Sequence, residues 1–171
     1  MEKYHVELCY RLNNKNAYLI CIGGEQDSLV TDDLGFVRGF TNPQSLLVYA
    51  HSKGISFSMF PNNSSELNLI DIDYLENWLV RKKTRTLKCD KLLSVWNLFW
   101  DVSYTVGHDF DQNKEVTNKV YDKLFFGCNL PPVTPPGKSY SPIWSSSEIK
   151  LIRSILAQGL QMFKEKVKEG Y

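Results

Sequence analysis

Cysteine and histidine are scarce in this chain of 171 residues, and the familiar local motifs of catalysis are missing. The four cysteines, Cys9, Cys21, Cys89 and Cys128, form no C-x-x-C pair, which excludes a zinc knuckle or a thioredoxin motif. No G-x-S-x-G elbow and no H-E-x-x-H helix is present. Gly23-Gly24 is not followed by the Gly-Lys-Ser/Thr of a phosphate-binding loop, so it is better interpreted as the end of a strand.

The chain also has almost no net charge and no long apolar run. Its formal charge is +1, so no overall field favours nucleic acid or an anionic membrane. No window approaches the length of a membrane span, and Met1–His5 leads into a predicted strand without the pattern of a signal peptide. Scattered thiols without an export signal are typical of the reducing cytosol. With the missing motifs, this predicts a cytoplasmic protein without membrane, metal or cofactor.

The chain is rich in apolar and aromatic residues. Apolar residues make up 43% and aromatic residues 13% of the sequence. A chain of this length buries enough surface to fold without disulfides or a metal. Strand-like alternation fills residues 1–70, helical spacing fills residues 71–171, and each half alone is small for an independent core. We predict one α+β domain over residues 1–171, with an N-terminal antiparallel β-rich part packed against a C-terminal set of amphipathic helices.

In the β-rich part the patterns predict four strands, at residues 5–12, 17–22, 35–40 and 55–60. The first two form an antiparallel hairpin with a four-residue connection, Asn13–Asn16. Asn42-Pro43 is typical of a helix start, with asparagine as the N-cap and proline at the first helical position. Gly54 predicts the end of that helix.

In the second half we expect four helices. Asp73 and Asp90 are the predicted N-caps of the first two, and Gly107 ends the second. The third covers residues 114–126, and Ser145-x-x-Glu148 is a capping box for the last. The apolar positions expected to be buried are Leu75, Trp78 and Leu79; Leu92, Val95, Trp96, Phe99, Val102 and Val106; Val116, Val120 and Leu124; and Ile149, Ile152, Leu156, Leu160, Phe163 and Val167. Residues 128–144, rich in proline, predict an ordered but irregular crossing.

Two weak constellations suggest alternative functions. His108-Asp109 resembles the dyad of a metal-dependent phosphohydrolase, with His51 and Asp111 as further ligands; the other interpretation is a polar loop after a helix. The basic run Arg81–Lys88 suggests a nucleic-acid-binding accessory domain, but no aromatic side chains interleave it. A solvated helix end, favoured by the helix dipole, explains the same run.

Carboxylates gather in three places, at Asp32-Asp33, at Asp71, Asp73 and Glu76, and at Asp109 and Asp111. Their turn-like neighbours favour solvated loops and helix caps, although exposed acids also suit a basic partner. Asn97, Asp101 and Tyr104 follow helical spacing on the second predicted helix. They form either a polar face toward solvent or a buried network, and the sequence leaves both open.

Two stretches carry a family likeness. The first is residues 33–42, DLGFVRGFTN, which lead into the helix with Tyr49-Ala50. The second is residues 121–132, YDKLFFGCNLPP, which lead through residues 140–144, YSPIW, into the last helix. With its size and missing chemistry, the chain resembles bacterial immunity proteins of contact-dependent growth inhibition and polymorphic toxin systems.

The resemblance implies a cytoplasmic protein that binds and neutralises a cognate toxin domain, often a nuclease, and that has no catalytic residues of its own. We expect steric occlusion of the toxin active site, with acidic loops displacing its anionic substrate. The expected partner contacts are Asp32, Asp33, His108, Asp109, Asp111, Tyr140 and Trp144. One departure matters, because immunity proteins against basic nucleases are often strongly acidic. At +1, recognition here rests on local acidic loops, aromatic anchors or shape.

Overall fold

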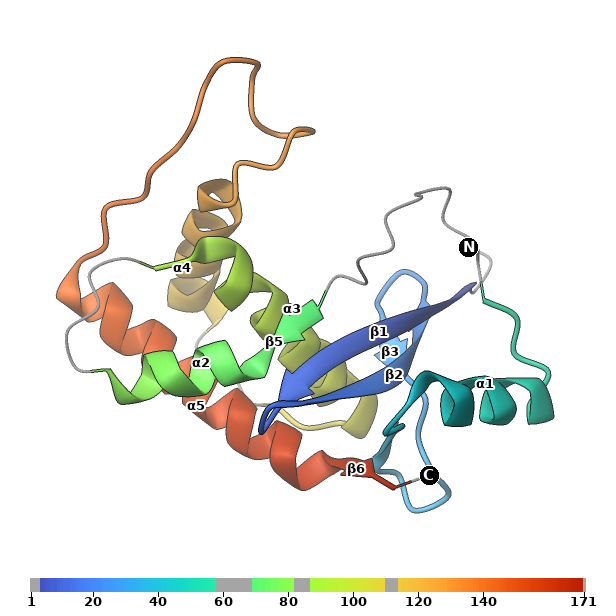
Figure 1. Cartoon of the computed structure of the whole chain (residues 1–171). Coiled ribbons are helices and arrows are strands. Elements are labelled where there is room, and N and C mark those ends of the chain that lie inside the picture. Colours follow the sequence, from blue (N-terminus) through green and yellow to red (C-terminus); the bar gives the residue numbers. More distant parts are fainter. Residues whose placement is uncertain (1–3, 58–68, 82–86, 110–113, 171) are drawn as a thin grey trace.

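A computed structural model describes residues 4–57, 69–81, 87–109 and 114–170. It has the predicted α+β fold, with most strands in the first half and most helices in the second (Figure 1). The elements in chain order are β1 (Tyr4–Leu12), β2 (Lys15–Gly23), β3 (Ser28–Leu29), β4 (Val37–Gly39), α1 (Pro43–Ser52), β5 (Leu69–Asp71), α2 (Ile72–Val80), α3 (Cys89–Val106), α4 (Lys114–Gly127), α5 (Ser146–Lys166) and β6 (Val167–Glu169).

The hairpin connection is shorter than predicted. Leu12 pairs with Lys15, so Asn13 and Asn14 alone form the turn. Both have positive φ, 55° and 58°, which is the backbone of a type I′ turn and matches the twist of the strands it joins. Asparagine tolerates this left-handed conformation better than most residues. The cluster of polar residues identified the turn, but their number overstated its length.

Two parallel strand pairs were missed by the sequence patterns. One sheet has the order β3-β2-β1-β5, with β5 parallel to β1, and a second pairs β4 with β6 in parallel. Both added strands are only three residues long, too short for an alternating pattern to be recognised. Of the strand predicted at residues 55–60, Phe57 forms an isolated bridge to His5, and residues 58–60 lie outside the described residues.

Helix α3 lies at the centre of the main hydrophobic cluster, which includes residues from both halves of the chain. Five of its predicted positions are buried, while Val106 is only partly so. At the crossing with α5, a Cβ on Gly159 would lie 2.3 Å from Phe99 Cδ2, so glycine is required there. The ring of Phe163 packs against Phe99 and Tyr10, with centroid distances of 5.6 and 5.1 Å.

Some of the helix caps and buried positions differ from the prediction, and others are confirmed. Asp71, not Asp73, caps α2, and Asp90 lies inside the first turn of α3, whose N-cap Lys88 makes no side-chain cap bond. The Ser145–Glu148 capping box of α5 is confirmed. On α4 the first position predicted to be buried is wrong: Val116 is 46% exposed, whereas the side chain of the next residue, Thr117, is only 2% exposed.

In α5 three of the predicted positions are buried (Ile152, Leu156 and Phe163), and Ile149 and Leu160 are half-buried. Val167 is buried too, but it belongs to β6, beyond the end of the helix. The helical spacing of the apolar residues therefore continued past the true helix end by one position.

Candidate binding sites

The acidic pair Asp32-Asp33 lies in the connection between β3 and β4. The Asp32 carboxylate accepts hydrogen bonds from the backbone N–H groups of Leu34 and Phe36, both at 2.9 Å. It therefore shapes its own loop. Asp33 is exposed. Of the pair, Asp33 has the carboxylate more accessible to a partner.

His108 and Asp109 follow the left-handed Gly107 at the end of α3, and both are exposed. Ser103 Oγ donates a hydrogen bond to the His108 carbonyl, which fastens this loop to the helix. Asp111 lies outside the described residues, and His51 is exposed in the last turn of α1. Among the side chains that the structure describes, no three His, Cys, Asp or Glu residues are grouped so that they could hold a metal ion. The hydrolase alternative stays a prediction.

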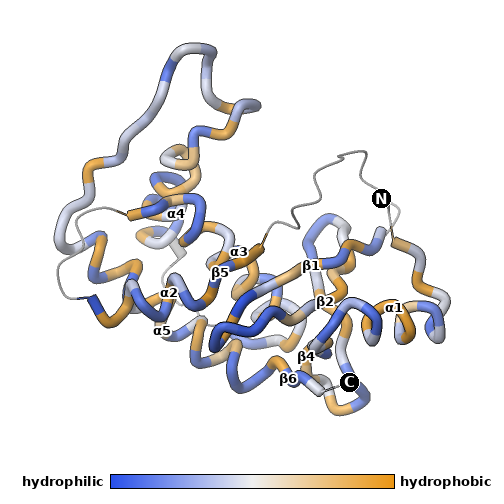
Figure 2. Tube along the Cα trace, in the orientation of Figure 1, coloured by the Kyte–Doolittle hydropathy of each residue, from blue (hydrophilic) through white to orange (hydrophobic). Residues whose placement is uncertain are grey.

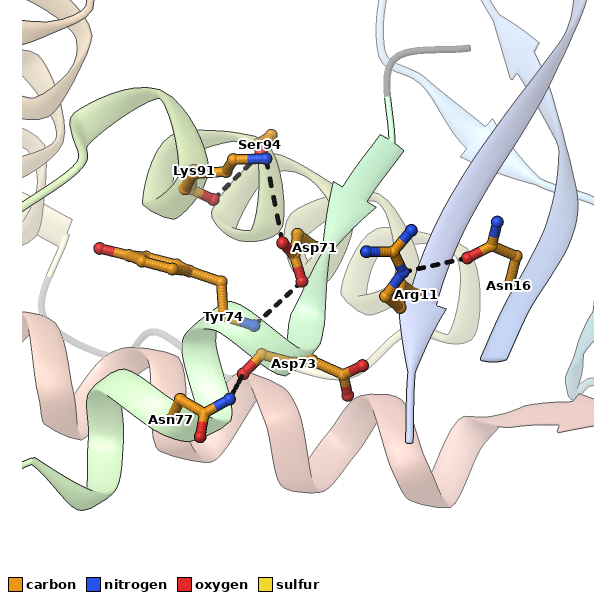
Figure 3. A network of polar contacts seen from close by, with 8 residues as sticks. All are labelled: Arg11, Asn16, Asp71, Asp73, Tyr74, Asn77, Lys91 and Ser94. Atoms are coloured by element: carbon orange, nitrogen blue, oxygen red, sulfur yellow. Dashed lines mark hydrogen bonds and ion pairs between the residues drawn. The ribbon is translucent and has the colours of Figure 1, made fainter. Parts of the chain in front are cut away.

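The acids near residue 71 have structural roles (Figure 3). Asp71 caps α2 by accepting from Tyr74 N at 3.0 Å, and it lies 3.9 Å from Lys91 Nζ. Asp73 accepts from the N–H groups of Asn13 and Asn14, at 2.7 and 2.8 Å, which ties the hairpin turn to α2. These bonds explain why carboxylates cluster at this edge without implying catalysis.

Of the basic run Arg81–Lys88, residues 82–86 lie outside the described part of the chain. The Arg81 carbonyl accepts a hydrogen bond from Arg153 at 2.6 Å, and Lys88 N donates to Tyr74 Oη at 3.4 Å. Both flanking residues thus contribute main-chain contacts to the fold. Nucleic-acid binding by this run stays a prediction.

The crossing at residues 128–144, here called the α4–α5 arm, projects away from the rest of the chain (Figure 1). Apolar positions recur along its trace (Figure 2). Its exposed large apolar side chains, together with Phe126 just before it, are Phe126, Leu130, Val133, Tyr140 and Ile143. Ile143 is 88% exposed. The arm has no regular secondary structure, as predicted. Cys128 and Trp144 at its two ends pack against the main cluster, whereas the large apolar residues between them are exposed.

Hydrogen bonds within the arm hold its shape. Asn129 has a positive φ of 51°, and its side-chain amide exchanges two bonds with the backbone of Tyr140: Nδ2 donates to the carbonyl at 3.0 Å and Oδ1 accepts from N–H at 2.6 Å. Lys123 Nζ binds Glu148 Oε1 at 2.8 Å and lies 5.0 Å from the centroid of the Trp144 ring, at the base of the arm. The arm is therefore preorganised.

The structure does not bring all the predicted contacts together. Tyr140 and Trp144 belong to the α4–α5 arm, whereas Asp32 and Asp33 lie next to β4, which pairs with β6 at the opposite end of the molecule (Figure 1). A single partner could therefore contact only one of these two ends, unless it wrapped around the protein.

A second candidate site is a cleft of about 300 Å³ between α3 and α4. Its walls come from one side of each helix, with residues spaced i, i+1, i+4, i+5 on α3 and i, i+1, i+4 on α4. The residues that line it are Trp96, Asn97, Trp100 and Asp101 of α3, Thr117, Asn118 and Tyr121 of α4, and Asp27 from the β2–β3 connection. Of the two alternatives for these polar residues, a face toward solvent describes Asn97 and Tyr104, which are exposed, whereas Asp101 is half-buried in the cleft that Asn97 also lines.

Local contacts build the cleft. Tyr121 Oη donates to Asn97 Oδ1 at 2.9 Å, and its ring meets that of Trp96 edge to face at 5.7 Å. On the other side, Leu29 N donates to Thr105 Oγ1 at 2.8 Å, which joins β3 to α3 and places Asp27 beside the helix. The sequence patterns missed Asp27 and Thr117, because only tertiary packing brings them to α3.

The electrostatics of the cleft are unusual. Burial, with the neighbouring negative charge of Asp27, raises the pKa of Asp101 to about 7. Burial, followed by the charges of Asp27 and Asp101, raises the pKa of the Cys21 thiol to about 12. Cys21 is thus a buried, neutral thiol near two carboxylates, with little tendency to react.

Within the described ranges, no helix is both long and apolar enough to cross a membrane. No protein-family model matches the chain, and a comparison with curated protein sequences finds no match. Among solved structures, the C-terminal domain of SatS, crystallised in complex with bromine, superposes with a TM-score of 0.55 and covers 97% of this chain and 94% of that one. At 9% identity, this similarity shows a common fold.

Proposed function

We propose that this protein works by binding another protein, as a cytoplasmic bacterial immunity protein that neutralises a cognate toxin domain. The observation that carries the proposal is the α4–α5 arm, where large apolar side chains stand exposed on a segment held in shape by its own hydrogen bonds. Contiguous exposed apolar surface is a common mark of a protein interface.

The chemistry of the arm suits binding better than catalysis. From Cys128 to Trp144 its one charged side chain is Lys138, and the remaining residues are apolar, proline, glycine or small and polar. Tyrosine and tryptophan are frequent anchors at interfaces. Tyr140 is exposed on the arm, and Trp144 is half-buried at its base. Because the arm is already ordered, little conformational entropy is lost when a partner covers it.

This placement sharpens the proposed mechanism. Asp32 already binds its own loop, so acid mimicry of a nucleic acid would rest on Asp33, Asp109 and Asp111. The arm offers steric occlusion instead: an apolar projection that enters or caps the active-site cleft of the toxin. A near-neutral chain then needs no strong electrostatic attraction, in accord with its charge of +1.

The test is co-purification with the toxin domain encoded by the neighbouring gene, followed by calorimetry and a growth-protection assay. Ile143→Asp is expected to weaken binding about tenfold or more, since it places a charge in an apolar contact. Val48→Asp is the matched control, because Val48 is an exposed aliphatic residue on α1, away from the arm.

Failure of the wild-type protein to form a complex and to protect cells would rule out the immunity function. A complex that Ile143→Asp and Val48→Asp weaken equally would leave the function standing but remove the arm as its contact surface.

A further inference from the structure

The cleft between α3 and α4 holds two carboxylates that form no ion pair with the residues that the structure describes. Asp27 Oδ1 accepts one bond, from Gly24 N at 3.3 Å. The Asp101 carboxylate makes no hydrogen bond or ion pair with any residue that the structure describes, and Thr105 contacts only its main-chain carbonyl. Both side chains are half-buried and line the same cavity. Two acids in such a place repel each other unless a positive group lies between them.

Aromatic rings complete the walls of the cleft. Trp96 is buried and Trp100 is 38% exposed, one turn apart on α3, and Tyr121 faces them from α4. The faces of indole and phenol rings attract cations, most strongly where water is partly excluded. Carboxylates beside aromatic rings are the lining that recognises ammonium and guanidinium groups, because one supplies charge and the other supplies a polarisable, weakly hydrated surface.

We infer that the α3–α4 cleft is a binding site for an organic cation, with Asp27 and Asp101 holding an ammonium or guanidinium group against Trp100 and Tyr121. A volume of about 300 Å³ stands at the lower limit of ligand pockets and admits one such group with a short stem. The cation is either a free small molecule or the side chain of an arginine or lysine on another protein. The site does not depend on the proposed function, because neither argument uses the other's residues.

Protonation of Asp101 makes the binding pH-dependent. Its carboxyl has a pKa of about 7, and it must be ionised to hold a cation, so affinity rises as the pH increases from 6 to 8. The other groups facing it are Asp27, Cys21 of β2 and Tyr121 of α4. The pKa of Cys21 is raised to about 12 and that of Tyr121 lies above its usual 10, mainly through burial, so both stay neutral over this range.

The experiment is a titration of the full chain with methylguanidinium, monitored by the amide and indole N–H resonances in a ¹⁵N correlation spectrum. Methylurea, a neutral molecule of the same shape, is the ligand control. We expect methylguanidinium to shift the Trp96 and Trp100 indole signals and to bind more tightly at pH 8 than at pH 6. Asp101→Asn is expected to weaken binding about tenfold or more and to abolish its pH dependence, since a charge-assisted hydrogen bond is lost.

Asp90→Asn is the matched protein control. It makes the same substitution in the same helix, on an exposed residue about 16 Å away along the axis. Equal binding of methylurea, unchanged affinity in Asp101→Asn, or equal losses in the two variants would each overturn the inference. A neutral monosaccharide that shifted the same indole signals when methylguanidinium did not would also overturn the inference.

Two further ligands separate the sources of the cation. Agmatine carries a guanidinium group on a free stem, and the blocked peptide acetyl-Gly-Arg-Gly-amide carries it on a protein backbone. Comparable affinities would support a cleft that receives an arginine side chain of another protein. Binding of agmatine alone would support a site for a free organic cation. Neither assay uses the toxin, so a negative result here is distinct from failure of the proposed function.

Discussion

Helix α3 and the α4–α5 arm are of similar length and are both rich in large apolar side chains, yet the fold uses them in opposite ways. In α3 the large apolar side chains repeat with helical spacing and nine residues are buried. In the arm Val133, Tyr140 and Ile143 are exposed. Composition alone therefore does not decide which apolar segment becomes core.

The difference lies in the backbone. Prolines recur through the arm, and proline lacks the N–H that a helix or sheet needs for its hydrogen bonds. Without a regular element, the arm has no single face that gathers its apolar side chains against the core. Helix α3 contains no proline or glycine before Gly107, so its side chains at i, i+3 and i+4 form one continuous stripe. Burial in α3 serves stability, and we propose that exposure in the arm serves recognition.

The largest expected effect comes from removing a ring where α3 packs on α5. Phe163→Ala should lower the free energy of unfolding by about 3–5 kcal/mol, because the ring fills the space between Phe99 and Tyr10. Phe126→Ala is the same substitution at the foot of the arm, on a side chain that is 50% exposed, and should cost less than about 1 kcal/mol. Urea denaturation of the two variants measures both values, and similar losses would contradict the contrast between the regions.

The same contrast explains what the sequence could predict. Long elements with a strong pattern were predicted correctly in kind: the hairpin, α1 with its Asn42 cap, and α5 with its capping box. Helical periodicity is a local property, so it can be recognised in the sequence before the fold is known. Three-residue strands such as β5 and β6 cannot be recognised in this way, because their pairing partners lie far away in the chain.

Site residues were harder to predict than elements for the same reason. The carboxylate of Asp73 looked like a helix cap and instead binds the hairpin turn 59 and 60 residues away in sequence. Asp27 lies in a polar stretch without any pattern, and it reaches α3 because β3 packs there, with Leu29 in the main cluster and bonded to Thr105. Asp101 follows helical spacing in the sequence, but whether its side chain faces solvent or a cavity depends on where α4 packs.

A second experiment tests whether the half-buried carboxylate of Asp101 lowers the stability of the protein. The pKa of Asp101 rises from its ordinary 3.8 to about 7 on folding, so the folded chain holds that proton more tightly than the unfolded chain. The stability this provides is fully present below about pH 4 and is lost as the pH rises to about 7. Asp101→Asn should therefore stabilise the protein by about 1–2 kcal/mol at pH 8, a value reduced by the solvent in the open cleft.

At pH 4 the two proteins should have nearly the same free energy of unfolding, since Asp101 is then protonated in the folded state. Denaturation of both proteins from pH 4 to pH 8 gives the difference directly. A variant that is less stable than the wild type at pH 8 would show that the carboxylate is held by favourable contacts. Neither the burial of Asp101 nor its repulsion by Asp27 would then dominate the energetics of the cleft.

The smallest global effect is expected where the arm is fastened. Asn129→Gly keeps the positive φ and removes three side-chain hydrogen bonds, two to the backbone of Tyr140 and one to the Gly127 carbonyl. The free energy of unfolding should change by less than about 0.5 kcal/mol, because the arm contributes little to the core. Hydrogen exchange at the Tyr140 amide should nevertheless accelerate about tenfold, because hydrogen bonds worth about 1 kcal/mol each no longer hold Tyr140 against residue 129.

Asn129→Asp retains the acceptor for the Tyr140 amide, so this amide should exchange at an intermediate rate in that variant. If Asn129→Gly lowered global stability as much as Phe163→Ala, the arm would belong to the cooperative core, and its exposed residues would need a structural explanation.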